Sequence, residues 1–152
     1  MMIAILLSIV YLFKYRNKTS IVIVLLQAIA VIAAFSKNIL GLFSTFFSVT
    51  VTVFFFAALI VACFYPIIYK NDYSAPKKRY ILWLFLFPII IKFIHAFAHW
   101  PGANQMALSM LVPVSLFIYI LIDRKNWKYE IGFMITFFAD ALLSLVWLAL
   151  FF

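Results

Sequence analysis

Residues 89–105 read IIIKFIHAFAHWPGANQ, an apolar run that carries one lysine and two histidines and then stops at Trp-Pro-Gly. Apolar runs of this kind are typical of helices that cross a membrane, and Pro-Gly favours a turn. We predict a helical hairpin in which Pro101 and Gly102 form the turn. Trp100 would lie at the outer membrane interface, and Asn104 would cap the following helix.

The composition of the whole chain agrees with a membrane protein. Of its 152 residues, 69% are hydrophobic and only 11% are charged, whereas soluble domains carry about a quarter charged residues. With only three glycines, a Gly-rich phosphate loop or dinucleotide fingerprint is excluded, and a single cysteine excludes an internal disulfide. The net charge of +8 does not indicate nucleic acid, because the basic residues cluster between apolar segments. The expected partners are membrane lipids.

Six apolar segments can be separated: 1–14, 20–36, 39–66, 81–99, 104–122 and 130–152. Each is predicted to be a helix, because a backbone in lipid must satisfy its own hydrogen bonds. We therefore predict an all-α, polytopic helical bundle with six transmembrane helices and short loops, forming one domain over 1–152. The first segment is shorter than the roughly 20 residues of a full span, so five spans are the alternative.

The distribution of charge predicts the orientation of the bundle. Segments 14–19, 70–80 and 123–129 hold ten of the twelve Lys and Arg residues. With six spans these loops share one side, and an excess of Lys and Arg marks the cytoplasmic side. Both termini would then face outward. The positive charges near the N-terminus follow the apolar run instead of preceding it, which predicts a retained helix and not a signal peptide.

Small polar residues and prolines predict local features of the helices. The third segment carries Ser44, Ser48 and Thr52 at a spacing of four, a stripe that favours close helix packing. Pro66 is expected to end this helix. Pro88 and Pro113 are expected to kink the fourth and fifth helices, because proline removes a backbone hydrogen bond.

Two sets of polar residues fall at helical spacing inside apolar segments: Lys92, His95 and His99 in the fourth, and Thr136, Asp140 and Ser144 in the sixth. At about 1.5 Å per residue, Lys92 lies some 16 Å beyond residue 81 and Asp140 some 14 Å beyond residue 131. An unpaired charge at the membrane centre costs about 2.5–3.5 kcal/mol. We therefore predict an ion pair between Lys92 and Asp140.

This intramembrane polar cluster has two interpretations. It fixes the register of the helices as a buried structural cluster, or it belongs to a proton or ion path. His95 and His99 are spaced four apart, which suits two metal ligands, but a third ligand is lacking, so we predict no metal site. The sequence holds no nucleophile motif and no paired carboxylates, which argues against an enzyme, and it indicates no cofactor.

The motif His99-Trp100-Pro101-Gly102-Ala103, preceded by a lysine, resembles the transmembrane hairpin of the L subunit of the gliding-motility and type IX secretion motor. The same motif occurs in small membrane proteins of the Bacteroidetes. The resemblance covers about a quarter of the chain and implies a bacterial inner membrane and an outward-facing turn. In the motor subunit the next helix carries an acidic residue associated with proton coupling, whereas 105–122 holds no acid. The resemblance therefore extends to the hairpin and not to the motor role.

Two hypotheses for function follow from these features. The first is a non-enzymatic, multi-pass inner-membrane protein that serves as a subunit or scaffold of a larger assembly, with other membrane subunits or a second copy as partners. The alternative is a small transporter, channel or proton-coupled component that uses the cluster of Lys92, His95, His99 and Asp140.

Overall fold

The computed structural model describes residues 1–15, 17–40, 44–68, 76–98 and 105–151, without the side chains of 37–40, 44–47, 76, 96, 97, 105 and 151. Its elements, in chain order, are α1 (Met2–Lys14), α2 (Lys18–Leu40), α3 (Ser44–Ile68), α4 (Pro76–Phe97), the 3-10 helix η1 (Gln105–Met110), α5 (Leu111–Ile122) and α6 (Ile131–Phe151). Over these ranges the structure contains helices and no strand, which confirms the all-α prediction.

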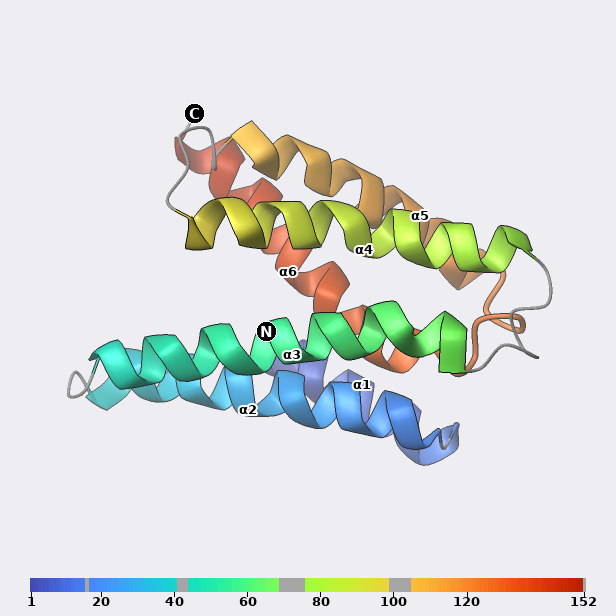
Figure 1. The fold of residues 1–152 in the computed structure, drawn as a ribbon, viewed down its shortest axis with the longest axis horizontal. Helices are drawn as coiled ribbons and strands as arrows, with labels where there is room; N and C mark the ends of the chain where they lie inside the picture. Colours follow the sequence, from blue (N-terminus) through green and yellow to red (C-terminus); the bar gives the residue numbers. More distant parts are fainter. Residues whose placement is uncertain (16, 41–43, 69–75, 99–104, 152) are drawn as a thin grey trace.

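The helices form two layers with α6 between them. The antiparallel pair α2 and α3 lies along one side of the bundle, α4 and α5 lie along the other, and α6 runs obliquely from one layer to the other (Figure 1). α1 packs against α6 and α2. The ends of α1, α3 and α5 and the starts of α2, α4 and α6 gather at one end of the bundle (Figure 1). The segments predicted to be basic connect these ends, so we call it the basic end.

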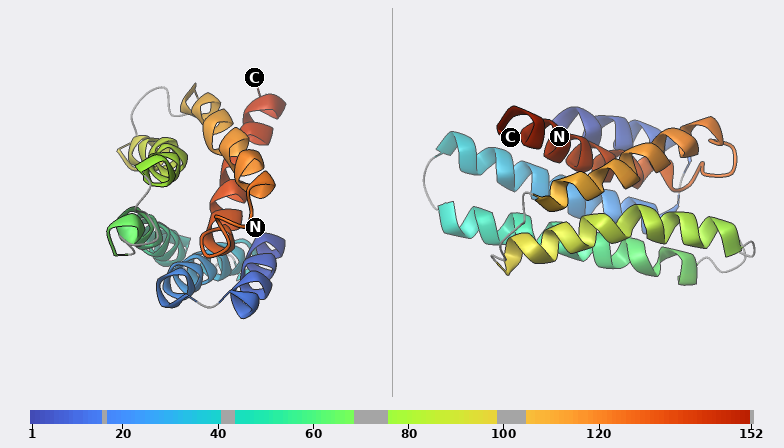
Figure 2. Two further views of the ribbon diagram at one scale, coloured as in Figure 1. Left: turned by 90° about the vertical axis from the view of Figure 1, so that its right-hand side faces the viewer. Right: turned by 90° about the horizontal axis from the view of Figure 1, so that it is seen from above.

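Three helices are long and apolar enough to cross a membrane: Lys18–Ser36 in α2, Ser48–Ile68 in α3 and Ile131–Leu150 in α6. α1 is different because it is only 13 residues long, about 20 Å at 1.5 Å per residue. Its first residue lies about midway along the bundle (Figure 2). α1 therefore covers only the basic half of α6.

Several predicted boundaries were wrong. α4 begins at Pro76 and not near residue 81, because proline is well suited to the first position of a helix. Lys77, Lys78 and Arg79 therefore occupy its first turn instead of a loop. α2 continues through 37–38, where a connection was predicted, to Leu40. α3 ends at Ile68, two residues after Pro66, so the proline lies inside its last turn and is not its last residue.

The other two prolines have different surroundings. Pro88 lies inside α4, which is helical on both sides of it. Pro113 is the third residue of α5, where its missing N–H has no partner within that helix in any case. The chain changes from 3-10 to α-helix at Leu111, two residues before Pro113, and the kinks at Pro88 and Pro113 stay predictions.

The core runs through the middle of the bundle and is rich in aromatic side chains. Tyr65, Phe85, Phe133 and Phe137 are among its largest fully buried members. Phe137 meets Phe55 edge to face at 5.6 Å between ring centroids, a geometry that aromatic pairs favour. This contact joins α6 to α3 and thereby helps to position Asp140, one turn after Phe137.

Candidate functional site

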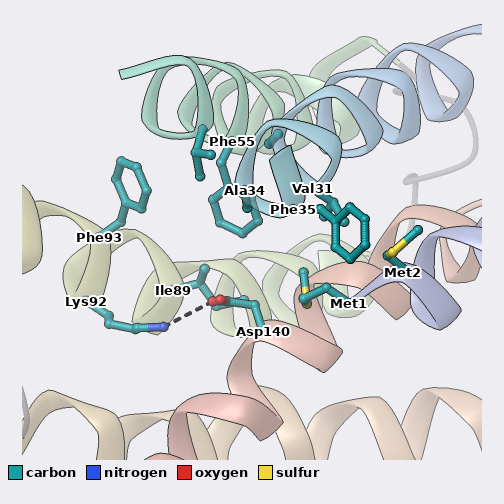
Figure 3. Close-up of a pocket in the computed structure, with 12 residues that line it drawn as sticks. Met1, Met2, Val31, Ala34, Phe35, Phe55, Ile89, Lys92, Phe93 and Asp140 are labelled. Atoms are coloured by element: carbon teal, nitrogen blue, oxygen red, sulfur yellow. Dashed lines mark hydrogen bonds and ion pairs between the residues drawn. The ribbon is translucent and has the colours of Figure 1, made fainter. Parts of the chain in front are cut away.

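The ion pair predicted from the sequence is present between α4 and α6. Lys92 Nζ lies 3.2 Å from Asp140 Oδ2 (Figure 3). Lys92 Nζ also donates a hydrogen bond to Ser144 Oγ, and the Ser144 hydroxyl donates to the backbone carbonyl of Asp140 at 2.7 Å. The carboxylate and the hydroxyl are one helical turn apart, so together they hold a single ammonium group.

The ion pair joins two helices that are not packed closely on each other. In the described part of the chain, the backbone of α6 packs against α1, α2, α5 and η1, and that of α4 against α3, α5 and η1. The long lysine side chain spans the remaining distance.

Lys92 and Asp140 also line a cavity of about 550 Å³. Figure 3 shows Lys92 and Asp140 on one side of it, Val31, Ala34 and Phe35 of α2 facing them, and the start of α1 at the edge. The other walls are mainly apolar, so the ion pair is the main polar feature of the lining. The side chains of Lys92 and Asp140 remain 26% and 28% exposed.

This arrangement can bind a polar group at an otherwise apolar site. An ammonium group has three N–H donors, and Asp140 and Ser144 engage two of them. A charge facing an apolar space is unfavourable unless water or another polar group solvates it. The cavity exceeds by far the volume that one water molecule needs. The site can therefore hold water, exchange a proton through the carboxylate, or accept a polar side chain from another helix.

The two histidines of the predicted cluster are placed differently. His95 Nδ1 lies 3.1 Å from the carbonyl oxygen of Ile91, one turn earlier in α4. His99 and the predicted outer turn of Trp100, Pro101 and Gly102 lie outside the described residues. Over the ranges that are described, no group of three or more His, Cys, Asp and Glu side chains could hold a metal ion.

Thr136 belongs to a separate contact, contrary to its predicted place in the cluster with Lys92. Its Oγ1 lies 3.1 Å from Ser8 Oγ of α1, and both side chains are completely buried. α1 comes close here because α6 has Gly132, where a Cβ atom would lie 3.3 Å from the Leu12 side chain. Ser8 was not among the predicted site residues, although a serine inside an apolar helix is a signal for a helix contact.

The predicted packing stripe on α3 is described only in part. Thr52 Oγ1 donates a hydrogen bond to the carbonyl oxygen of Ser48 at 2.9 Å, within the helix. The side chain of Ser44 lies outside the described part. The bond seen here satisfies a hydroxyl locally and does not join two helices.

A second ion pair, which the sequence analysis did not anticipate, lies at the basic end. Lys78 Nζ is 2.9 Å from Glu130 Oε1, and it lies 5.2 Å from the centroid of the Trp127 ring. The Glu130 side chain is only 1% exposed. The pair ties the first turn of α4 to the start of α6. It was missed because Lys78 was assigned to a loop, and Glu130, the first residue of the sixth segment, was not considered as its partner.

Comparisons of the chain with protein-family models, curated proteins and solved structures gave no match. The resemblance of the 99–103 motif to the motor subunit therefore stays a prediction.

Proposed function

We propose that the chain is a multi-pass protein of a bacterial inner membrane, with the basic end in the cytoplasm. Support comes from the three helices of spanning length and composition and from the common end at which the basic segments join the helices (Figure 1). Lys14, Lys77 and Arg124 are among the cations at that end, in keeping with the positive-inside rule. We propose six spans, with five spans, excluding α1, as the alternative.

Within that membrane, we propose that the protein is a non-enzymatic subunit of a larger assembly. The observation that carries this proposal is the partly exposed Lys92–Asp140 pair, which faces the cavity beside the start of α1. Because both charged side chains are about a quarter exposed, a helix from another protein can reach the ion pair. A polar side chain on that helix would solvate the ion pair, which lipid chains cannot do.

The partner helix can be tested by photo-crosslinking in the native membrane. A photoreactive residue at Phe35, which lines the cavity and is 48% exposed, should form one defined adduct with a second copy or another membrane protein. Phe64 on α3 is a matched control, because it is 54% exposed but does not line the cavity. A monodisperse, uncrosslinked chain after gentle detergent extraction would contradict the proposal.

The cavity also favours a second candidate function, a proton-coupled membrane component. Lys92 and Asp140 line a space large enough for water, and water can carry protons to a carboxylate. Purified protein in liposomes would dissipate an imposed pH gradient, and Asp140→Asn would abolish this activity. Lys125→Gln, at an exposed charge of the basic end, is the control. No dissipation by the unmodified protein, or dissipation that persists in Asp140→Asn, would exclude this candidate.

A further inference from the structure

A second groove, of about 420 Å³, lies at the basic end between the start of α4, the end of α5 and the segment that follows it. Lys77 and Lys78 line it from α4, and Asp123 and Asn126 line it from the α5 side. Its volume is within the range of about 300–1,000 Å³ that is usual for small-molecule sites. The groove is separate from the cavity beside Lys92.

The charges of this groove are divided between its walls. Glu130, which does not line the groove, compensates the charge of Lys78 through their salt bridge. Lys77 and Asp123 carry opposite charges but form no salt bridge with each other. The salt bridges found among the described residues are Lys78–Glu130 and Lys92–Asp140. The Asn126 amide donates to both oxygens of Asp123, at 2.8 and 3.1 Å. A carboxylate has about four acceptor positions, so Asp123 can accept further donors.

The position of the groove points to a lipid head group. Lys77 is in the first turn of α4 and Asp123 directly follows α5, so both lie where a spanning bundle meets the head-group region. Tyr119 and Trp127 also line the groove, and these residue types are enriched at membrane interfaces. Ile122, at the end of α5, is 81% exposed and offers an apolar surface for acyl chains.

We propose that this groove binds the head group of a zwitterionic phospholipid with a primary amine, phosphatidylethanolamine being the chemical type. Lys77 pairs with the phosphate, and Asp123 accepts hydrogen bonds from the ammonium group. An anionic lipid would satisfy Lys77 but leave Asp123 facing a second negative charge. A quaternary ammonium head group has no N–H to donate to Asp123. This inference rests on the proposed membrane location and is independent of the partner helix.

Native mass spectrometry of the full chain, released from detergent, can measure this selectivity. Phosphatidylethanolamine, phosphatidylcholine and phosphatidylglycerol with identical acyl chains would be titrated separately, and the first should bind most tightly. Lys77→Gln and Asp123→Asn should each weaken its binding by up to about fivefold, the upper end of what exposed charge pairs usually give. Lys125→Gln is the matched control, because Lys125 is an exposed cation of the same segment outside the groove lining, and it should have no effect.

Two results would overturn the inference while leaving the proposed function intact. One is phosphatidylglycerol binding at least as tightly as phosphatidylethanolamine. The other is equal binding of phosphatidylethanolamine by all three variants, measured on protein that still fractionates with membranes and keeps its helix content. Soluble phosphoethanolamine, added as a competitor, should displace the lipid only at much higher concentration, and efficient displacement would show that the ligand is the free head group and overturn the assignment to a lipid. Absence of the chain from the membrane fraction would contradict the proposed function itself.

Discussion

The two ion pairs of this protein have similar chemistry and contrasting surroundings. Lys78–Glu130 is closed, since its carboxylate is 1% exposed and its ammonium lies over the Trp127 ring. Lys92–Asp140 is open, since both partners are exposed by about a quarter and face a cavity. The closed pair has the features of a structural tie between α4 and α6. In the open pair, part of each charged group remains accessible to water or to a polar group of another molecule. The comparison therefore predicts large effects on stability at the first pair and effects mainly on function at the second.

The largest effect is expected from Lys78→Met. This change leaves the Glu130 carboxylate buried without its cation, and breaking a buried ion pair from one side costs about 3–5 kcal/mol. We expect a value near the lower limit, because Lys78 is 16% exposed and the pair lies close to water. Thermal or denaturant unfolding in a fixed detergent would measure it. Lys77→Met, on an exposed neighbour, should change stability by less than about 0.5 kcal/mol, and equal effects of the two changes would contradict the closed character of the pair.

An intermediate effect is expected from Asp140→Asn. The amide keeps the shape and can still accept from Lys92, and the site is partly exposed, so we expect a loss of about 1 kcal/mol. Partner adducts at Phe35, or proton flux, should fall far more than stability does. A double-mutant cycle with Lys92→Met would give the coupling energy of the pair. If the two single changes simply add in the double mutant, the ion pair contributes nothing and the comparison fails.

Features of the site that follow from the geometry of a single helix could be predicted from the sequence, whereas features that depend on how the helices pack together could not. The depth of Lys92 and Asp140 follows from helical rise and from two co-directional helices, so their pairing was predictable. The closed pair was not, because it depended on where α4 begins, and Pro76 moved that start by five residues. The cavity was not predictable either, since residues of α1, α2, α3, α4 and α6 line it together and hydropathy does not give the relative placement of helices. Hydropathy shows that a segment is apolar, but it does not give the distances and crossing angles between that helix and its neighbours.

The contact between Thr136 and Ser8 shows the same limit on a smaller scale. The spacing of Thr136, Asp140 and Ser144 correctly placed them along one side of α6. However, successive turns of an oblique helix meet different neighbours. Thr136 therefore meets α1, whereas Asp140 and Ser144 meet α4. Periodicity predicts a shared face and cannot say which helix that face contacts at each turn.

The smallest effect on stability is expected from Ala34→Phe. This change also distinguishes the open pair from the closed pair most clearly. Ala34 lines the cavity opposite the open pair (Figure 3), so a larger side chain can enter the space without displacing a packed neighbour. Stability should change by less than about 1 kcal/mol, because overpacking is costly only where no space exists. Partner adducts at Phe35, or proton flux, should nevertheless be lost, since the ring occupies the place of the partner group or of water. Ala58→Phe, at a position that is 0% exposed in the core, is the control and should destabilise the protein strongly. If Ala34→Phe instead unfolds the chain as Ala58→Phe does, the open pair is packed like the closed one, and no functional site remains between α4 and α6.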